Sequence, residues 1–277
     1  MLNSVLHESP RGVLALGRSE IQARFSVDGR LDRYEDSDIE VTQSRHVTHF
    51  RSPPYYPRDV SGGPTFEVEA TWWAGQHVVV GLDEVGRGSL AGPIVVGAVV
   101  WTEDDAVPPG IRDSKKITDT RRRELAPAIW TAARAAAVGR ASAEEIDQWG
   151  IRTAQAVATH RALDALSVTP TAMIIDGPTN FAQPPRQMSL AAAMAPLGTW
   201  GALPCTCIVK GDDASLSVAA AAIIAKVWRD DYMHDLELTL PGYGFAEHVG
   251  YGTTSHRAAI SSLGATSEHR QTWHLID

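Results

Sequence analysis

The segment His77–Pro93, which reads HVVVGLDEVGRGSLAGP, constrains the possible folds more than any other part of the chain. Val78–Leu82 has the length and the β-branched content of a buried strand. Two carboxylates, Asp83 and Glu84, follow this apolar run directly. Because an unpaired buried carboxylate is very costly, we expect the strand to end at a sheet edge where a cation holds these charges.

The residues that follow the two acids are Gly86, Arg87 and Gly88. Glycines let the backbone approach a ligand closely, and the arginine between them offers a bidentate donor for a phosphate. Acids that can hold a metal therefore lie beside groups that can hold a phosphate. This combination indicates chemistry on nucleic acid.

Composition places the chain among soluble globular proteins. It has 277 residues, of which 44% are hydrophobic and 21% charged, enough for one large domain or two small ones. No apolar run approaches the roughly 20 residues that span a bilayer, and the N-terminus lacks the features of a secretory signal. We expect a cytoplasmic monomer that makes no contact with a membrane.

Net charge and cysteine content bear on how the protein could bind nucleic acid and on the redox state of its compartment. The net charge of −8 argues against bulk electrostatic capture of nucleic acid, although divalent metals could invert the charge at a local site. Cys205 and Cys207 are the only cysteines. We expect them to point to opposite faces of a strand and to remain reduced, as in a cytoplasmic protein.

Residues 1–75 read differently from residues 76–277, and we take them as an N-terminal extension. They are polar and contain no lysine. A hairpin turn is expected at Asp28-Gly29 and a strand within Ile39–Phe50, so the extension is either a small β-rich appendage or partly disordered. Trp72 and Trp73, near its end, could pack it onto the main domain.

From His77 onward, apolar strand-like runs alternate with helical patterns, which is typical of an α/β layer fold. Expected strands are His77–Asp83, Ile94–Trp101, Ala172–Ile175 and Pro204–Lys210. Expected helices run from Thr118 towards Ala137, from the capping box that opens at Ser142 through Leu166 with a break near Gly150, and over Ser217–Leu238 with a small-residue face.

Acids lie at or just after the ends of three of these expected strands in the sequence. Asp83 and Glu84 lie at the end of the first, Asp176 follows the strand at 172–175, and Asp212 follows the strand at 204–210. If the strands are neighbours, the acids converge on one sheet edge, where they would repel each other unless divalent cations bind among them. Oxygen ligands favour Mg²⁺ or Mn²⁺, and two such ions about 4 Å apart can drive phosphodiester hydrolysis.

Taken alone, each of these signals is more often explained by an ordinary structural role. An acid at a strand end is more often a turn residue, Gly86-Arg87-Gly88 a tight turn, and Asp113–Lys116 a solvated loop. Tyr251 is more often a packing residue, and His248, His256 and His269 are more often structural than ligands. The joint occurrence of the signals, in this order, favours the functional interpretation.

The order of these motifs resembles the ribonuclease HII family from about residue 76 to the C-terminus. The matching blocks are GLDEVGRGSLAGP, RDSKK at 112–116, IIDG at 174–177, KGDDASLSVAAAAIIAKVWRD at 210–230, YGFAEHVGYGTTSH at 243–256 and GATSEHRQTW at 264–273. The resemblance implies an RNase H-like mixed sheet flanked by helices. It also implies cleavage of the RNA strand in RNA–DNA hybrids, and cutting on the 5′ side of a ribonucleotide embedded in duplex DNA.

The same resemblance assigns roles to residues of this chain. Asp83, Glu84, Asp176 and Asp212 match the catalytic, metal-binding acids of the family, and the KGD register favours Asp212 over Asp213. Gly86, Arg87 and Gly88 match the loop that reads the ribonucleotide 2′-hydroxyl. Tyr251 matches a tyrosine that stacks on the next sugar, and Lys115 matches a residue that faces the substrate phosphates.

Three departures from the family pattern stand out: Arg112 where asparagine is common, Ser89 where proline is common, and the N-terminal extension. Ribonuclease HIII also carries an N-terminal domain. However, Gly86-Arg87-Gly88 favours ribonuclease HII, and residues 1–75 are not expected to form the basic surface of a substrate-binding module. A non-catalytic nucleic-acid-binding protein would be expected to have lost an acid. A nucleotide-binding domain lacks support because no P-loop lysine pattern is present.

Overall fold

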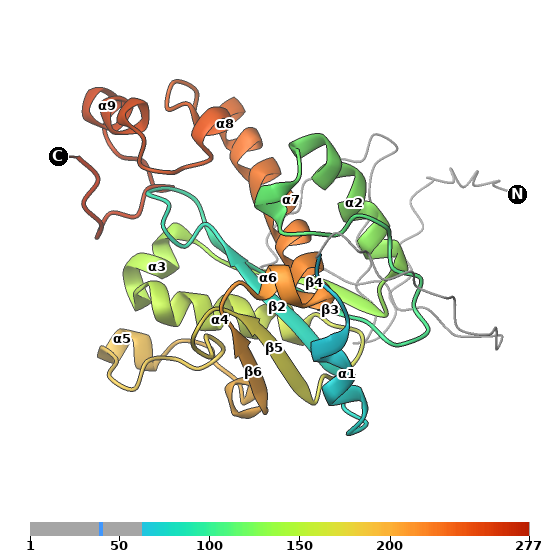
Figure 1. The fold of residues 1–277 in the computed structure, drawn as a ribbon. Helices are drawn as coiled ribbons and strands as arrows, with labels where there is room; N and C mark the ends of the chain where they lie inside the picture. Colours follow the sequence, from blue (N-terminus) through green and yellow to red (C-terminus); the bar gives the residue numbers. More distant parts are fainter. Residues whose placement is uncertain (1–38, 41–62, 277) are drawn as a thin grey trace, which may run out of the picture.

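A computed structural model describes residues 39–40 and 63–276 of the chain. Figure 1 shows a central sheet with helices on both faces and a C-terminal lobe beyond one end of the longest helix. In this part of the chain the sheet has six strands in the order β1-β4-β3-β2-β5-β6. β2, β3 and β4 are antiparallel neighbours, and β5 and β6 join in parallel. This mixed sheet flanked by helices confirms the predicted α/β fold class.

The strands are β1 (Ile39–Glu40), β2 (Val79–Val85), β3 (Ile94–Val100), β4 (Ala135–Ala141), β5 (Ala172–Asp176) and β6 (Cys205–Ile208). The helices are α1 (Glu67–Trp73), α2 (Asp119–Ala132), α3 (Ala143–Trp149), α4 (Ile151–Asp164), α5 (Leu190–Ala193), α6 (Gly211–Ala214), α7 (Leu216–Thr239), α8 (Phe245–His248) and α9 (Thr254–Leu263), with 3-10 turns η1 (Ser114–Lys116) and η2 (Trp200–Ala202).

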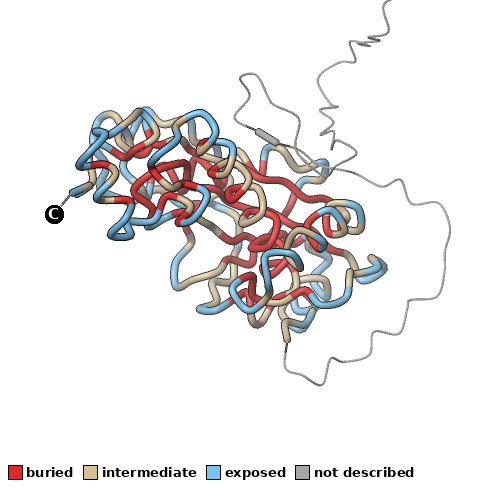
Figure 2. Tube along the Cα trace, turned by 90° about the horizontal axis from the view of Figure 1, so that it is seen from above, coloured by how far each residue is buried: buried red, intermediate tan, exposed pale blue. Residues whose placement is uncertain are grey.

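The sheet is the middle layer of three. One face, which includes Leu82 and Val96, packs against α3 and α4, and the other, which includes Val95 and Val99, packs against α2 and α7. Burying both faces explains why β3 is an unbroken run of buried residues. Figure 2 shows the buried residues concentrated along this middle layer.

Helix α7 approaches the sheet closely because small residues meet on both sides. A Cβ placed on Gly97 would lie 2.2 Å from the carbonyl oxygen of Ala221, and one on Gly81 would lie 2.3 Å from the Ser217 backbone. The small-residue face predicted for this helix therefore packs as expected. This close contact sets the start of α7 over β2, the strand that carries Asp83.

Three predicted element boundaries were wrong. The helix expected to run to Ala137 ends at Ala132, and the alanine-rich segment Ala135–Ala141 is strand β4. Pairing with β3 overrides the helical propensity of alanine there. Strand β2 continues through Asp83 and Glu84 to Val85, and Asp212 lies in α6 rather than at the end of a strand, because β6 already ends at Ile208.

The capping box at Ser142 is confirmed. The Ser142 hydroxyl accepts a hydrogen bond from the Glu145 backbone, and the Glu145 carboxylate accepts one from the Ser142 N–H. Gly150, with φ +77°, separates α3 from α4 and confirms the predicted break. The pair of helices brings α4 across the face of the sheet.

Helix α1 lies within the predicted extension and packs against the main body. Trp72 and Trp73 contact the buried core, as the sequence suggested. The Glu69 side chain is fully buried, and its carboxylate accepts hydrogen bonds from Ser215 Oγ at 2.6 Å and from the Ser217 N–H at 2.8 Å. Glu69 thus ties α1 to the start of α7.

The predicted orientation of the two cysteines was wrong. Cys205 and Cys207 are free thiols with Sγ atoms 4.0 Å apart, so the prediction of opposite faces was wrong, because alternate residues of a strand share a face. Two elements were expected in the N-terminal extension. Of the expected strand Ile39–Phe50, only Ile39–Glu40 is described, and these two residues pair with β4. The hairpin expected at Asp28-Gly29 lies outside the described residues. Among the helices of the described part, none has the length and hydropathy needed to cross a membrane.

Candidate active site

Neighbouring parallel strands bring three of the predicted acids to one edge of the sheet. Leu82 of β2 pairs with Ile175 of β5, so that the following residues, Asp83 and Asp176, lie side by side at the carboxyl ends of the two strands. Glu84 follows in β2. The carboxyl end of a parallel pair is the usual ligand-binding edge of an α/β sheet.

The fourth acid, Asp212, comes from the first turn of α6. The N–H of Gly211 donates to Asp176 Oδ1 at 2.7 Å, which fixes Asp176 and draws α6 onto the end of β5. Lys210 takes a left-handed conformation, with φ +61°, and so turns the chain sharply after β6. Asp212 is only 5% exposed. The turn therefore delivers a buried carboxylate to the edge where Asp83 and Asp176 lie.

The four acids interact electrostatically. Burial raises the pKa of Asp83 well above its ordinary value, and the charges of Glu84, Asp176 and Asp212 raise it further. Burial also raises the pKa of Glu84, although Arg87 opposes that shift. Burial and then Asp113 raise the pKa of Asp212 to about 6. Each shift disfavours the ionised form, so the protein alone does not neutralise this cluster.

A divalent cation would resolve this repulsion. The donor set consists of carboxylate oxygens, the ligands that Mg²⁺ and Mn²⁺ prefer. Asp83, Glu84, Asp176 and Asp212 are the residues that would hold the metal. The raised pKa values of Asp83, Glu84 and Asp212 indicate a site poor in compensating charge. The residues present fit a divalent metal.

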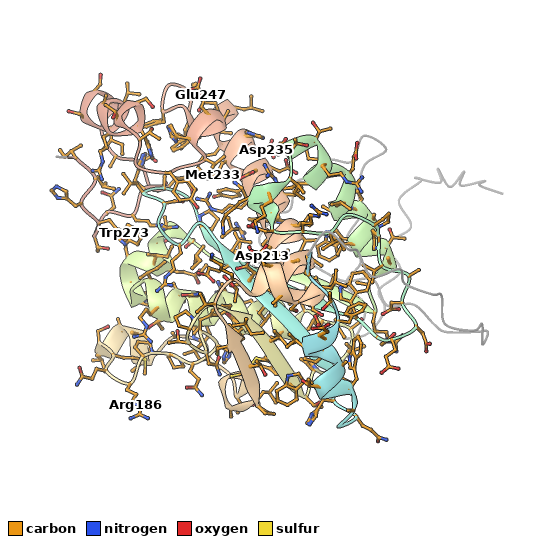
Figure 3. The ribbon with its side chains drawn as sticks, in the orientation of Figure 1. Arg186, Asp213, Met233, Asp235, Glu247 and Trp273 are labelled. Atoms are coloured by element: carbon orange, nitrogen blue, oxygen red, sulfur yellow. The ribbon has the colours of Figure 1, made fainter. Side chains whose placement is uncertain are left out.

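A short loop before α2 places cations at the rim of this cluster. Lys115 Nζ lies 4.0 Å from Asp212 Oδ2, and its side chain is 83% exposed. Partial burial lowers the pKa of Lys115, but Asp212 and neighbouring acids raise it overall. Lys116 donates to both carboxylate oxygens of Asp213, which projects from α6 in Figure 3. Lys115 and Lys116 thus pair with the adjacent acids Asp212 and Asp213, respectively.

Two fully buried arginines, which the sequence analysis did not single out, hold the glycine loop. Arg270 donates to the carbonyl oxygens of Gly86 at 2.6 Å and Arg87 at 2.8 Å. Arg229 donates to the carbonyl oxygen of Pro93 at 3.0 Å, and a Cβ on Gly86 would lie 2.0 Å from Arg229 Nε. Gly86 also has φ +81°, so this position requires glycine.

The loop keeps its outer side open. A Cβ on Gly88 would have no neighbour within 4 Å, and the Arg87 side chain is 55% exposed, with Nη1 3.8 Å from Glu84 Oε1. Arg270 engages the carbonyl groups of Gly86 and Arg87 from within. The open side of the loop is therefore available to a ligand beside the acids.

Tyr251 lies on a loop that is tied to the same region. The carbonyl oxygen of Gly250 accepts from the N–H of Leu90 at 2.8 Å, and Tyr251 is 40% exposed. Val249 has φ +43°, an unusual conformation for a β-branched residue, and its carbonyl oxygen accepts from Arg229 at 2.8 Å. Arg229 therefore braces both the glycine loop and the loop that carries Tyr251.

Two buried histidines, His256 and His269, hold the loop that carries Tyr251 through a chain of hydrogen bonds. Thr266 N–H donates to His269 Nδ1 at 3.0 Å, so the neutral His269 carries its proton on Nε2 and donates to His256 Nε2 at 3.2 Å. His256 Nδ1–H then donates to the carbonyl oxygen of Tyr251 at 3.0 Å. Burial lowers the pKa of His269 to about 4. The structural interpretation of these histidines is confirmed.

The sheet order and the carboxylate cluster together define a metal-dependent nuclease with an RNase H-like fold. The family model for ribonuclease HII matches residues 80–276, and the chain belongs to this family. It is 44% identical over 200 residues to ribonuclease HII of Geobacillus thermodenitrificans, covering 72% of this chain and 70% of that one. With ribonuclease HII of Jannaschia sp. it is 43% identical over 211 residues, covering 76% and 95%.

Solved structures agree with this assignment. Ribonuclease H2 from Pyrococcus horikoshii aligns with a TM-score of 0.54 and 26% identity over 71% of this chain and 94% of that one. Ribonuclease HII in the PCNA complex from Archaeoglobus fulgidus aligns with a TM-score of 0.53 and 28% identity over 72% and 96%. The expected family is confirmed, and the chain is a metal-dependent ribonuclease whose family cleaves the RNA of RNA–DNA hybrids.

Proposed function

We propose that this enzyme cuts the 5′ side of single ribonucleotides embedded in duplex DNA, and so initiates their removal. The observation that carries the proposal is that the glycine loop, Gly86 to Gly88, begins two residues after Glu84 and is joined through Leu90 to the loop bearing Tyr251. The loop proposed to bind one 2′-hydroxyl and the tyrosine proposed to stack on the next sugar are therefore held together by hydrogen bonds, beside the carboxylates.

The roles of individual residues follow from their chemistry. The 2′-hydroxyl is the group that marks RNA within DNA, and it both donates and accepts hydrogen bonds. Backbone groups of Gly86, Arg87 and Gly88 can meet it without an intervening side chain. The exposed ring of Tyr251 would stack on the following sugar and favour a deoxyribose there. Lys115 would bind phosphate oxygens at the rim of the acid cluster.

The reaction is hydrolysis of one phosphodiester. The oxygen of a water molecule forms a bond to phosphorus, and the bond from phosphorus to the 3′ oxygen of the preceding nucleotide breaks, which leaves a 3′-hydroxyl and a 5′-phosphate. Asp83, Glu84, Asp176 and Asp212 would hold Mg²⁺ or Mn²⁺, which when bound activates water and stabilises the leaving oxygen. Binding through phosphates and one hydroxyl predicts cutting that is independent of base sequence.

The wider setting belongs to the same proposal. We take residues 76–277 as the catalytic domain and residues 1–75 as an N-terminal extension, with α1 of the extension packed onto the catalytic body. RNA–DNA hybrids and ribonucleotide-containing DNA duplexes are the expected substrates. A monomer in the cytoplasm, acting in DNA replication and repair, would meet both.

The test uses duplex DNA that contains one ribonucleotide, with Mg²⁺ or Mn²⁺ supplied. We expect a single cut on the 5′ side of the ribonucleotide, identified by the mass of the two fragments, and no cut in an all-DNA duplex. Asp83→Asn serves as the inactive control. Cleavage of an RNA–DNA hybrid without any cut at the single ribonucleotide would refute the proposed specificity while leaving the family activity intact.

A further inference from the structure

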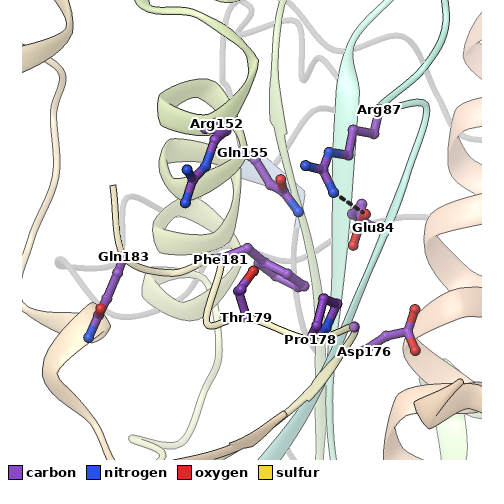
Figure 4. A pocket seen from close by; sticks show the side chains of 10 residues that line it. Glu84, Arg87, Arg152, Gln155, Asp176, Pro178, Thr179, Phe181 and Gln183 are labelled. Carbon is purple, nitrogen blue, oxygen red and sulfur yellow. Dashed lines mark ion pairs between the residues drawn. The ribbon is translucent and has the colours of Figure 1, made fainter. Parts of the chain in front are cut away.

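A cavity of about 60 Å³ opens beside the acid cluster, on the α4 side of the sheet. Glu84 and Asp176 form the edge that it shares with the cluster, and Arg87, Arg152, Gln155 and Thr179 line the remainder. Figure 4 shows Arg152 and Gln155 projecting from the same helix, with Arg87 across the opening. This volume is that of a few water molecules, so the cavity suits one small polar group rather than a whole nucleotide.

Gln155 is the unusual member of this lining. Its residue is only 3% exposed, and the part of it that is accessible lines the cavity. The amide can therefore donate hydrogen bonds to a group bound in the cavity.

Arg152 adds a charge to the same wall. It lies three residues before Gln155 on α4, so that both side chains share one face of the helix. Within the described residues, Arg152 has no carboxylate partner, whereas Arg161 on the same helix pairs with Glu145 at 2.7 Å. Arg152 is exposed and Gln155 is buried, so a charged group lies at the entrance of the cavity and a polar group lies deeper inside it.

We propose that this cavity is a subsite for a backbone phosphate of the strand being cut, next to the scissile linkage. The inference rests on the proposed function for the position of the substrate. Two guanidinium groups, from Arg87 and Arg152, match a phosphate, and the Gln155 amide and the Thr179 hydroxyl can donate to its oxygens. The shared edge, Glu84 and Asp176, makes the bound phosphate a neighbour of the one that is hydrolysed.

The cavity does not suit a base. Phe181, the aromatic residue in its wall, is 9% exposed and packs into the hydrophobic core, so its ring has no free face for stacking. Binding of a base to a single strand normally uses such a face. The subsite should therefore hold the strand in position without reading its sequence.

The test compares Arg152→Ala and Gln155→Leu with the parent enzyme. Leucine keeps the volume of Gln155 and removes its ability to donate or accept hydrogen bonds. Arg121→Ala is the matched control, because Arg121 is an arginine on α2, on the opposite face of the sheet, where it pairs with Glu124 at 2.9 Å. Thermal unfolding of each variant checks that it folds.

Steady-state cleavage is measured on the single-ribonucleotide duplex and on an RNA–DNA hybrid. We expect both variants to raise KM about tenfold with little change in kcat, as for loss of a hydrogen bond to a charged group. For Arg152→Ala, the slope of log affinity against log salt should fall by about 0.9, which is the value for one lost phosphate contact. Arg121→Ala should match the parent enzyme in both measurements.

Substitution of single phosphates by uncharged methylphosphonates then locates the contact. At one linkage near the cut, the parent enzyme should lose about tenfold in kcat/KM and Arg152→Ala should lose nothing further. Equal losses for parent and variant at every linkage, or a KM unchanged by both substitutions, would overturn the subsite. Because the hybrid is measured in parallel, a failure of the single-ribonucleotide activity remains distinguishable from a failure of the subsite.

Discussion

Glu69 joins a helix of the N-terminal extension to the catalytic body, and its removal gives a quantitative prediction. The carboxylate accepts hydrogen bonds from Ser215 Oγ and from the Ser217 N–H. Without this acceptor, the buried Ser215 hydroxyl and Ser217 N–H would lose their partner, at about 1–3 kcal/mol each, and removal of the buried carboxyl group offsets part of this. We therefore expect Glu69→Ala to lower the free energy of unfolding by about 3 kcal/mol.

Glu69→Gln is the control that separates charge from hydrogen bonding. Burial raises the pKa of the Glu69 carboxyl, although the bonds from Ser215 and Ser217 lower it, so the ionised form is not strongly favoured. Glutamine keeps an acceptor oxygen and removes the buried charge. Its free energy of unfolding should lie within about 1 kcal/mol of that of the parent.

Truncation extends the same prediction to the whole of α1. A chain starting at Gln76 loses Glu69 and also Phe66 and Trp73, which pack partly buried against the core. At about 1.5–3 kcal/mol for a fully buried large side chain, these two residues add about 2 kcal/mol, for a total near 5 kcal/mol. Because domains are stable by only about 5–15 kcal/mol, that chain should be partly unfolded at 37 °C.

The assay is urea unfolding followed by circular dichroism, with cleavage of an RNA–DNA hybrid measured on the same samples. A chain starting at Gly63 keeps α1 and is the matched comparison for the chain starting at Gln76. Equal stability of the two truncated chains, or a Glu69→Ala variant within about 0.5 kcal/mol of the parent, would refute the reasoning.

Four further outcomes are expected. Asp83→Asn should lower kcat about 10³-fold while leaving substrate affinity within a few-fold, as measured by single-turnover cleavage and by binding. Tyr251→Ala should reduce the preference for a ribonucleotide followed by deoxyribose about tenfold, and Tyr251→Phe should retain it; unchanged preference in the alanine variant would contradict stacking. Because burial lowers the pKa of His269 to about 4, the unfolded chain binds more protons between about pH 6.5 and pH 4. The contribution of His269, measured as the difference in free energy of unfolding between the parent and His269→Asn, should be level above that range. As the pH is lowered through the range, this difference should shift against the parent by up to about 1.4 kcal/mol per pH unit, as checked by unfolding both proteins at a series of pH values. Chelation by EDTA should abolish cleavage with no change in the far-ultraviolet circular dichroism, and added Mg²⁺ or Mn²⁺ should restore it.

Much of the fold could be predicted because local patterns decided it. The capping box at Ser142, the glycine break at Gly150 and the small face of α7 each have a local cause, and each was found where it was expected. The helix expected to reach Ala137 failed for the opposite reason. Alanine favours a helix in isolation, but β3 offers β4 a full ladder of partners, and tertiary pairing prevails.

The candidate site divides in the same way. The positions of Asp83, Glu84, Asp176 and Asp212 stood out because acids seldom follow buried apolar runs. The groups that brace them did not stand out. Arg270 acts on the glycine loop from 183 residues away along the chain, and Arg229 acts on it from 136 residues away through Pro93. Nothing local distinguishes these arginines from surface ones.

By itself the sequence determined the types of residue available for chemistry and the order in which they occur, since motifs such as Asp83 to Gly88 are contiguous. Only the tertiary structure decided which residues face one another. It placed Glu69 against the start of α7, set Arg229 and Arg270 behind the two loops, and placed Gln155 in the wall of a cavity. The physical reason is that burial and hydrogen-bond partnership depend on contacts between segments far apart in the chain, which no local pattern encodes.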